Sequence, residues 1–292
     1  MSLPASPVAP RTASVEVRDA CVSVTGQGPR VTPVGARQRV REALIQIYEK
    51  RLARALEGAE TPRHVGVIID GNRRWARSIG LDDVNDGHRV GADKIADFLC
   101  WCDEAGVEVV TIFLLSTENL ARAEPELLPL LRIIEGVAED LSSVHRRWHL
   151  RAMGALDLLP PETVAVLKQA EDLTRDRPGA TVNLAVSYGG RREIADAVRS
   201  LLAEHAERGT SLDELVDTLD VEHIAEHLYT RGQPDPDLII RTSGEQRLSG
   251  FLLWQTAHAE FYFTDVYWPD FRRVDFLRAL RDYAARHRRF GS

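Results

Sequence analysis

The chain has 292 residues, 44% of them hydrophobic and 28% charged, which is the mix of an ordinary globular domain. The formal net charge of −7 excludes a protein-wide basic field, so we expect no nucleic-acid partner and only a local anion site. No run of about 18 apolar residues occurs, and no signal-peptide core opens the chain. The sequence therefore predicts a cytoplasmic protein without a transmembrane helix.

The N-terminal part of the chain divides into two segments. Residues 1–37 are rich in Ser, Pro, Gly and Thr without a clear hydrophobic period, and they predict a flexible tail. Apolar residues at helical spacing follow over about 38–56, and Gly58 and Pro62 end this helix. We expect residues 38–292 to form one domain, which opens with this helix.

Strand-like and helical patterns alternate through the rest of the chain. Short branched apolar runs predict strands at 64–69, 107–115, 149–153, 181–187 and 237–241, with a sixth near 260–264. Helical spacing lies between them at 88–105, 125–145, 160–174, 190–208 and 211–230, with a last helix after Val274. This order predicts an α/β fold with a mostly parallel central sheet of about six strands covered by helices. No G-x-G-x-x-G motif occurs, which argues against a Rossmann fold.

Three polar residues follow directly on strand-like runs. Asp70, Ser116 and Arg241 each stand at the end of such a run. Right-handed crossovers place the carboxyl ends of parallel strands on one edge of the sheet, where ligands of open α/β sheets bind. We therefore expect these three residues to converge on one site.

The stretch from His64 to Arg77, HVGVIIDGNRRWAR, carries the clearest chemical signal. A strand that stops at Asp-Gly-Asn exposes backbone N–H groups, which suit a phosphate. The arginines that follow supply guanidinium groups for its oxygens, and Asp70 is a ligand type that suits Mg²⁺. The alternative is an ordinary turn with solvated arginines.

The same stretch resembles the signature of the cis-prenyltransferases, which join isopentenyl diphosphate to an allylic diphosphate. Four further stretches match this family in the same order, and a fifth closes the set: Ser116–Asn119, Ser187–Arg191, Asp237–Ser249, Phe251–Gln255, and Glu260 with Phe263–Asp265. The resemblance runs from about His64 to Gly291, and it implies the fold and the activity of that family.

The resemblance implies two diphosphate sites. The first diphosphate site, for the allylic substrate, comprises Gly71, Asn72, Arg73, Arg74, Trp75, Arg77 and His88, with Asp70 on Mg²⁺ as cofactor. The second diphosphate site, for isopentenyl diphosphate, comprises Arg241, Arg247, Leu248 and Ser249. At position 73 the family usually has Gly, so Arg73 adds a charge. Glu260 matches a family glutamate linked to the metal and to the partner of a homodimer.

A third group of residues is implied to handle the proton of isopentenyl diphosphate. Asn119 with Ser116 matches residues that orient this substrate and assist its deprotonation, with Thr117, Glu118 and Arg122 as further substrate contacts. Because an amide is a poor base, the diphosphate itself is the alternative proton acceptor.

Two departures from the long-chain pattern predict a short product. Leu114 stands where long-chain members have a small residue, and Leu120 where they have Trp. A bulky side chain in a close-packed tunnel stops a growing chain. Together with the stretch RRWARS at 73–78, these departures resemble the short-chain actinobacterial type, which makes (2Z,6E)-farnesyl diphosphate. We therefore expect a C15 product from geranyl diphosphate. The alternatives are a long-chain synthase or a non-catalytic accessory subunit, and peripheral contact with a membrane stays open.

Three other motifs have readings outside this chemistry. The acidic loop Leu81–Asp86 matches the D-D-x-x-D motif of all-α trans-prenyltransferases, which we interpret as a coincidence. His223, Glu226 and His227 match the H-x-x-E-H of zinc peptidases, and a solvated helix face is the favoured interpretation. The ending Arg289–Gly291 resembles an R-x-G terminus that reaches toward a partner's active site.

Overall fold

The computed structural model describes residues 36–287, and strand β1 (His64–Ile68) lies inside its central sheet. Every residue of β1 is buried, because parallel neighbours pair with it on both sides and helices cover the sheet. The strand order is β3-β4-β2-β1-β5-β6, and each neighbouring pair in this order is parallel. The other strands are β2 (Val109–Phe113), β3 (His149–Met153), β4 (Thr181–Ala185), β5 (Leu238–Arg241) and β6 (Glu260–Phe263). The predicted six-stranded parallel α/β sheet is confirmed.

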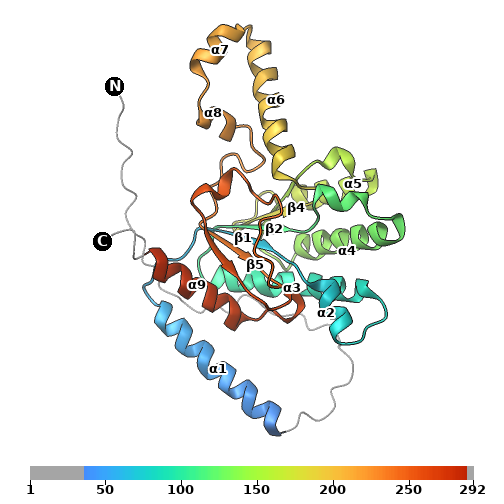
Figure 1. The fold of residues 1–292 in the computed structure, drawn as a ribbon, viewed down its shortest axis with the longest axis vertical. Coiled ribbons are helices and arrows are strands. Elements are labelled where there is room, and N and C mark those ends of the chain that lie inside the picture. The colour runs from blue at the N-terminus through green and yellow to red at the C-terminus, as the bar shows by residue number, and fades with distance from the viewer. Residues whose placement is uncertain (1–35, 288–292) are drawn as a thin grey trace.

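The helices connect these strands as the sequence pattern predicts (Figure 1). They are α1 (Ala36–Leu56), α2 (Asn72–Ser78), α3 (Val84–Glu104), α4 (Glu124–Ser142), α5 (Pro161–Thr174), α6 (Gly190–Arg208), α7 (Leu212–Thr218), α8 (Val221–Ala225) and α9 (Arg273–His287). Within the described part of the chain, no helix is long and apolar enough to cross a membrane. The predicted tail lies outside the described residues except at its end, where α1 begins, and the Arg289–Gly291 ending lies outside them as well.

One expected helix, over 211–230, is wrong. The segment forms two short helices, because Leu219 leaves helical geometry and Asp220 caps a new helix start through a capping box with His223. Val221, the first residue of α8, is 56% exposed, and α8 ends before Glu226. Helices α6 to α8 project away from the sheet in Figure 1.

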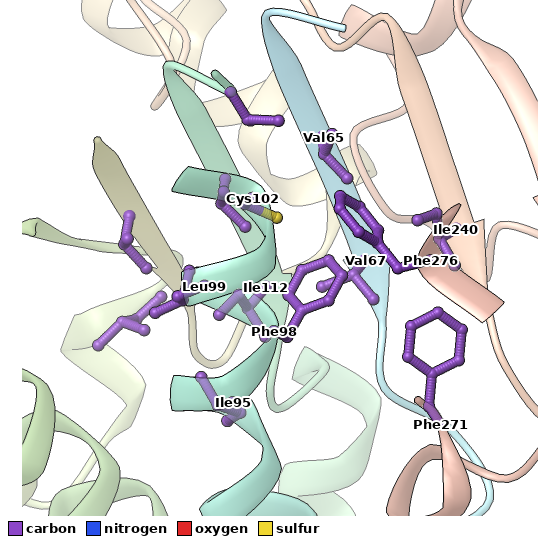
Figure 2. Packing of buried hydrophobic residues seen from close by; sticks show 14 of the residues in the cluster. Val65, Val67, Ile95, Phe98, Leu99, Cys102, Ile112, Ile240, Phe271 and Phe276 are labelled. Carbon is purple, nitrogen blue, oxygen red and sulfur yellow. The ribbon is translucent and has the colours of Figure 1, made fainter. Parts of the chain in front are cut away.

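The main core lies on the face of the sheet that α3 covers. Figure 2 shows Ile95, Phe98, Leu99 and Cys102 of α3 facing strand residues such as Val67. Phe98 stands edge-on to Trp268 and to other rings, an arrangement that adds to the burial of apolar area. This core fixes α3, and therefore the site residues near its N-terminus, against β1 and β2.

A smaller apolar cluster covers the opposite face. It consists of Ile68, Met153, Ala185, Tyr188, Ile239, Phe251 and Leu252. Gly66 in the middle of β1 makes room for it, since a Cβ there would lie 3.0 Å from Cε1 of Phe251. Phe251 stacks on Phe113 of β2 with ring centroids 4.9 Å apart. The loop after β5 is thus anchored directly on the sheet.

Candidate active site

The carboxyl edge of β1, β2 and β5 opens into a cavity of about 720 Å³. One part is polar and is lined by Asp70, Gly71, Asn72, Arg73, Arg74, Arg77, His88, Ser116, Glu118, Asn119, Arg122, Arg241, Arg247 and Ser249. The other part is an apolar lobe, lined mainly by Ile95 of α3, by Leu114, and by Leu130, Ile133, Ile134 and Val137 of α4. The predicted convergence of Asp70, Ser116 and Arg241 on one site is confirmed by this lining.

The first diphosphate site begins at a turn that requires glycine. Gly71 has a φ of 100°, in the left-handed region, and a Cβ there would lie 2.6 Å from Cδ1 of Tyr267 and 2.9 Å from Cβ of Ser243. The tight turn lets α2 start immediately, and Arg74 then donates to the hydroxyl of Ser243 at 2.6 Å. The guanidinium of Arg74 also lies 5.7 Å from the ring centre of Tyr267 and 3.3 Å from Glu245. Arg74 is held at the cavity by several partners before any ligand arrives.

Asp70 lies between the two diphosphate sites. Its carboxylate accepts hydrogen bonds from Arg241 at 2.9 Å and from the backbone N–H of Gly71 at 2.7 Å, and Arg74 approaches to 3.7 Å. Burial raises the pKa of Asp70, but these hydrogen bonds and the charges of Arg241 and Arg74 outweigh burial and lower it overall. The carboxylate is therefore ionised at neutral pH and ready for a cation.

The second diphosphate site is built around a buried guanidinium. Arg241 ends β5, and its side chain is only 4% exposed. It donates to the hydroxyl of Ser249 at 2.9 Å and to the carbonyl of Arg247. Ser249 has a φ of 49°, which is strained for a residue other than glycine, so the surrounding contacts must hold it. Arg247 is 63% exposed and pairs with Glu245.

A buried polar network holds the loop of the second site. Tyr188 accepts from the backbone N–H of Leu252 at 3.2 Å and donates to Glu193, whose carboxylate also accepts from Gln255 at 3.0 Å. Glu193 and Gln255 are each 1% exposed. Burial raises the pKa of Glu193, while these hydrogen bonds lower it in part. This network anchors the loop at Leu252, whose φ of 45° is also strained, three residues beyond Ser249.

A cationic cluster forms the outer side of the polar part. Arg122 donates to the amide oxygen of Asn119 at 3.1 Å, and Asn119 follows Ser116, whose hydroxyl caps the short helix Thr117–Ala121. Burial and the charges of Arg122 and Arg73 lower the pKa of His88 to about 4. Burial and the charge of Arg73 also lower the pKa of Arg122. Burial is the largest cause of both shifts, and the neighbouring positive charges add to it, so an anion bound here would offset those charges.

Four of the predicted site residues lie outside the cavity lining. Trp75 is half-buried on α2, Thr117 bonds the carbonyl of Ser187 at 3.1 Å, and Leu248 packs on the smaller apolar cluster. Glu260 starts β6, in register with Leu238 at the start of β5, whereas Asp70 follows the far end of β1. Its carboxylate pairs with Arg286 at 2.9 Å. Within one chain the two carboxylates predicted for the metal therefore do not meet.

Other residues of the site escaped the sequence reasoning. Ser243, Glu245 and Gln255 stood in the matched stretches without a role. Tyr267, in the loop after β6, and Glu193, on α6, contact the site from outside those stretches. The only sequence signal near the apolar lobe is the helical spacing of the apolar residues in α3 and α4. No local pattern marks which of those residues face a cavity.

The competing motifs find ordinary structural uses. His223 accepts from the N–H of Asp220 at 3.0 Å, and His227 bonds Ser200 at 2.9 Å. In the acidic loop, Asp83 caps α3. Among residues 36–287, no group of three or more His, Cys, Asp or Glu side chains is arranged to hold a metal ion. The described structure gives the zinc-peptidase interpretation no support.

The site nevertheless suits Mg²⁺ if one carboxylate, substrate phosphates and water serve together as its ligands. Mg²⁺ keeps several waters and commonly binds through one or two carboxylates plus substrate phosphates. Asp70 offers one ionised carboxylate at the cavity, between guanidinium groups that suit those phosphates. Asp70 is therefore the residue that would hold the ion, with the remaining ligands coming from substrate and water.

Comparisons with known proteins agree with this geometry. A family model described as "Putative undecaprenyl diphosphate synthase" matches residues 68–291. A (2Z,6E)-farnesyl diphosphate synthase of Thermobifida fusca is 63% identical over 86% of this chain and 98% of its own length. A short-chain Z-isoprenyl diphosphate synthase of Mycobacterium bovis is 55% identical over 87% of this chain and 97% of its own.

A solved structure is similar across most of the fold. The lavandulyl diphosphate synthase of Lavandula x intermedia, in complex with dimethylallyl diphosphate, superposes with a TM-score of 0.72. It is 37% identical and covers 80% of this chain and 99% of its own. Fold, cavity, motifs and relatives lead to one conclusion: the chain belongs to the cis-prenyltransferase family.

Proposed function

We propose that this cis-prenyltransferase condenses isopentenyl diphosphate with geranyl diphosphate to give (2Z,6E)-farnesyl diphosphate. The observation that carries the proposal is that Arg241 and Arg74 both approach Oδ2 of the Asp70 carboxylate, at 2.9 and 3.7 Å. Two guanidinium sites beside one carboxylate suit two diphosphates and a shared cation. Relatives named (2Z,6E)-farnesyl diphosphate synthase support the same product.

The residues divide the work of the reaction. Arg74 and Arg77 bind the allylic diphosphate, while Arg241, Ser249 and Arg247 orient isopentenyl diphosphate. Asp70 would hold Mg²⁺, which as a Lewis acid would assist departure of the allylic diphosphate. One carbon–carbon bond forms, the allylic diphosphate leaves, and one proton is lost from the isopentenyl unit. Asn119 orients that unit, and a diphosphate oxygen accepts the proton because an amide is a poor base.

The apolar lobe limits the length of the product. Leu114 lines the cavity beyond β2 and packs on the main core, and its N–H donates to the carbonyl of Ala185 at 3.0 Å. Because the backbone of Leu114 is bonded to the sheet and its side chain packs on the core, the residue has little freedom to yield to a growing chain. We therefore expect a C15 product rather than a long chain.

A product assay tests the proposal. The purified protein is incubated with isopentenyl diphosphate, Mg²⁺ and, in turn, dimethylallyl, geranyl and farnesyl diphosphate, and the products are sized. A single C15 product from geranyl diphosphate is expected, and Leu114→Ala should extend it. A ladder of long products from the natural chain would contradict the chain-length argument. No product with any primer would instead indicate an accessory subunit.

The assembly state and location complete the proposal. We expect a cytoplasmic homodimer that contacts membranes at most peripherally. Glu260 is the residue that ties the dimer to the chemistry, because its family counterpart is linked to the metal while here it pairs with Arg286 of its own chain. Sedimentation equilibrium of the full chain measures the assembly state, and a monomer that is active at all concentrations would contradict the expectation.

A further inference from the structure

An ion pair crosses the mouth of the cavity from α2 to α4. Both terminal nitrogens of Arg73 face the carboxylate of Glu126, with N–O distances of 3.3 and 3.4 Å. Arg73 is the second residue of α2 and lines the cavity, whereas Glu126 lies in the first turn of α4 outside the lining. The side chains are 34% and 48% exposed, so solvent screens the pair and leaves it easy to break.

Glu126 also offsets the positive charge around the cavity mouth. The charge of Arg73 lowers the pKa of both His88 and Arg122, and the charge of Glu126 opposes both effects. Arg122 has a neutral partner, the amide of Asn119. The negative charge of Glu126 therefore partly neutralises Arg73, as the charge of a bound anion would.

We propose that Glu126 competes with the substrate for Arg73 and holds its guanidinium until an allylic diphosphate displaces it. The diphosphate carries more negative charge than a carboxylate and offers more acceptor oxygens, so it competes well for the same fork of N–H groups. Every allylic substrate must overcome the Arg73–Glu126 pair before Arg73 contributes to binding. The inference rests on the proposed function, because it takes the first diphosphate site to hold that substrate.

The proposal gives Arg73 a defined task. Arg74 has partners inside the site, namely Ser243 and Glu245. The partner of Arg73, in contrast, is Glu126 on α4. A primer whose diphosphate draws Arg73 away from Glu126 removes this ion pair between α2 and α4.

The test is a binding cycle with geranyl diphosphate, titrated by calorimetry without isopentenyl diphosphate. Glu126→Gln should lower its Kd about two- to fivefold, the range expected for losing a competing exposed ion pair. In the Arg73→Gly background, the same Glu126→Gln change should have no effect on Kd. At about 1 M salt the Glu126→Gln gain should vanish, because the Debye length falls to roughly 3 Å.

Glu124→Gln is the matched control. Glu124 lies on the same first turn of α4, is exposed, and makes no ion pair with any of residues 36–287. Glu124→Gln removes one negative charge from the same helix turn, as Glu126→Gln does. An equal decrease of the Kd in both variants would overturn the proposal, because it would show a general effect of charge rather than loss of the ion pair. A higher Kd for Glu126→Gln would overturn it as well, since Glu126 would then orient Arg73 rather than compete for it.

A kinetic arm separates this inference from the proposed function. In the prenyl-transfer assay, Glu126→Gln should lower the KM of geranyl diphosphate and leave the KM of isopentenyl diphosphate unchanged. Absence of any turnover in the natural chain would contradict the proposed function, while the binding cycle would still report on the Arg73–Glu126 pair. Turnover with no difference between Glu126→Gln and the natural chain in either KM or Kd would contradict the pair alone.

Discussion

The two proposed diphosphate sites have similar tasks but are built differently. The first is almost continuous in sequence. Asp70, Gly71 and Arg74 lie within five consecutive positions, at the end of β1, in the glycine turn and in the first turn of α2. The second is a long loop after β5, whose Ser249 and Leu252 have φ angles of 49° and 45° without being glycines. Local geometry determines the first site, whereas buried partners from distant segments hold the second. The comparison teaches that substitutions should act locally in one site and through remote contacts in the other.

Asp70→Asn should have the largest effect, because Asp70 serves both sites. The amide keeps the shape and one acceptor for Arg241 but loses the charge that would bind Mg²⁺, and we expect kcat to fall about 10³-fold. The measurement is steady-state turnover together with the melting temperature. Asp82→Asn, an exposed acid of the loop before α3, is the control. Near-normal turnover in Asp70→Asn would remove Asp70 from the mechanism.

Gly71→Ala tests whether the first site depends on its local turn. Alanine there meets a φ of 100° and the ring of Tyr267 at 2.6 Å, so we expect a loss of about 2 kcal/mol in stability and a raised KM for the allylic diphosphate. Gly80→Ala is the matched control, since its φ of 76° is similarly strained but nothing lies within 4 Å of the added Cβ. Equal effects of the two changes on KM would mean that the close approach to Tyr267 is unimportant.

Tyr188→Phe tests the remote support of the second site. Loss of the hydroxyl leaves the buried N–H of Leu252 without its partner and should cost about 1–2 kcal/mol. The KM of isopentenyl diphosphate should rise severalfold, while that of the allylic diphosphate stays the same. Tyr229→Phe removes the same group from a hydrogen bond to Asp196, and should leave both KM values unchanged. A parallel rise of both KM values in Tyr188→Phe would refute separate support of the two sites.

The smallest effect concerns pH and His88. Its folded pKa of about 4 lies below the unfolded value of roughly 6.5, so the unfolded state binds the proton first. Stability is fully present above pH 6.5 and should fall as pH drops toward 4. His64, also lowered to about 4 by burial, acts in the same window, so the natural chain must be compared with His88→Gln. Urea melts between pH 7 and 4 should show a shallower fall in His88→Gln, and identical slopes would contradict the prediction.

Much of the first site follows from the sequence because its geometry is local. A buried strand that ends in Asp-Gly-Asn before a helix determines where Asp70 and Arg74 lie, and the period of the apolar residues determines the parallel sheet beneath them. The order of the strand-like runs also placed Ser116 and Arg241 at the same edge. These features depend on contacts between neighbours in sequence and on general rules of chain handedness.

Contacts between distant segments decided the rest. The sequence does not show that Glu126 faces Arg73, that Glu193 and Gln255 hold the second site, or that Glu260 lies at the far end of its strand from Asp70. Nor does it show the break at Asp220, where a cap outweighs a continuous helical pattern. Loops whose residues adopt strained φ angles take their shape from packing across the sheet, and that packing exists only once the chain has folded.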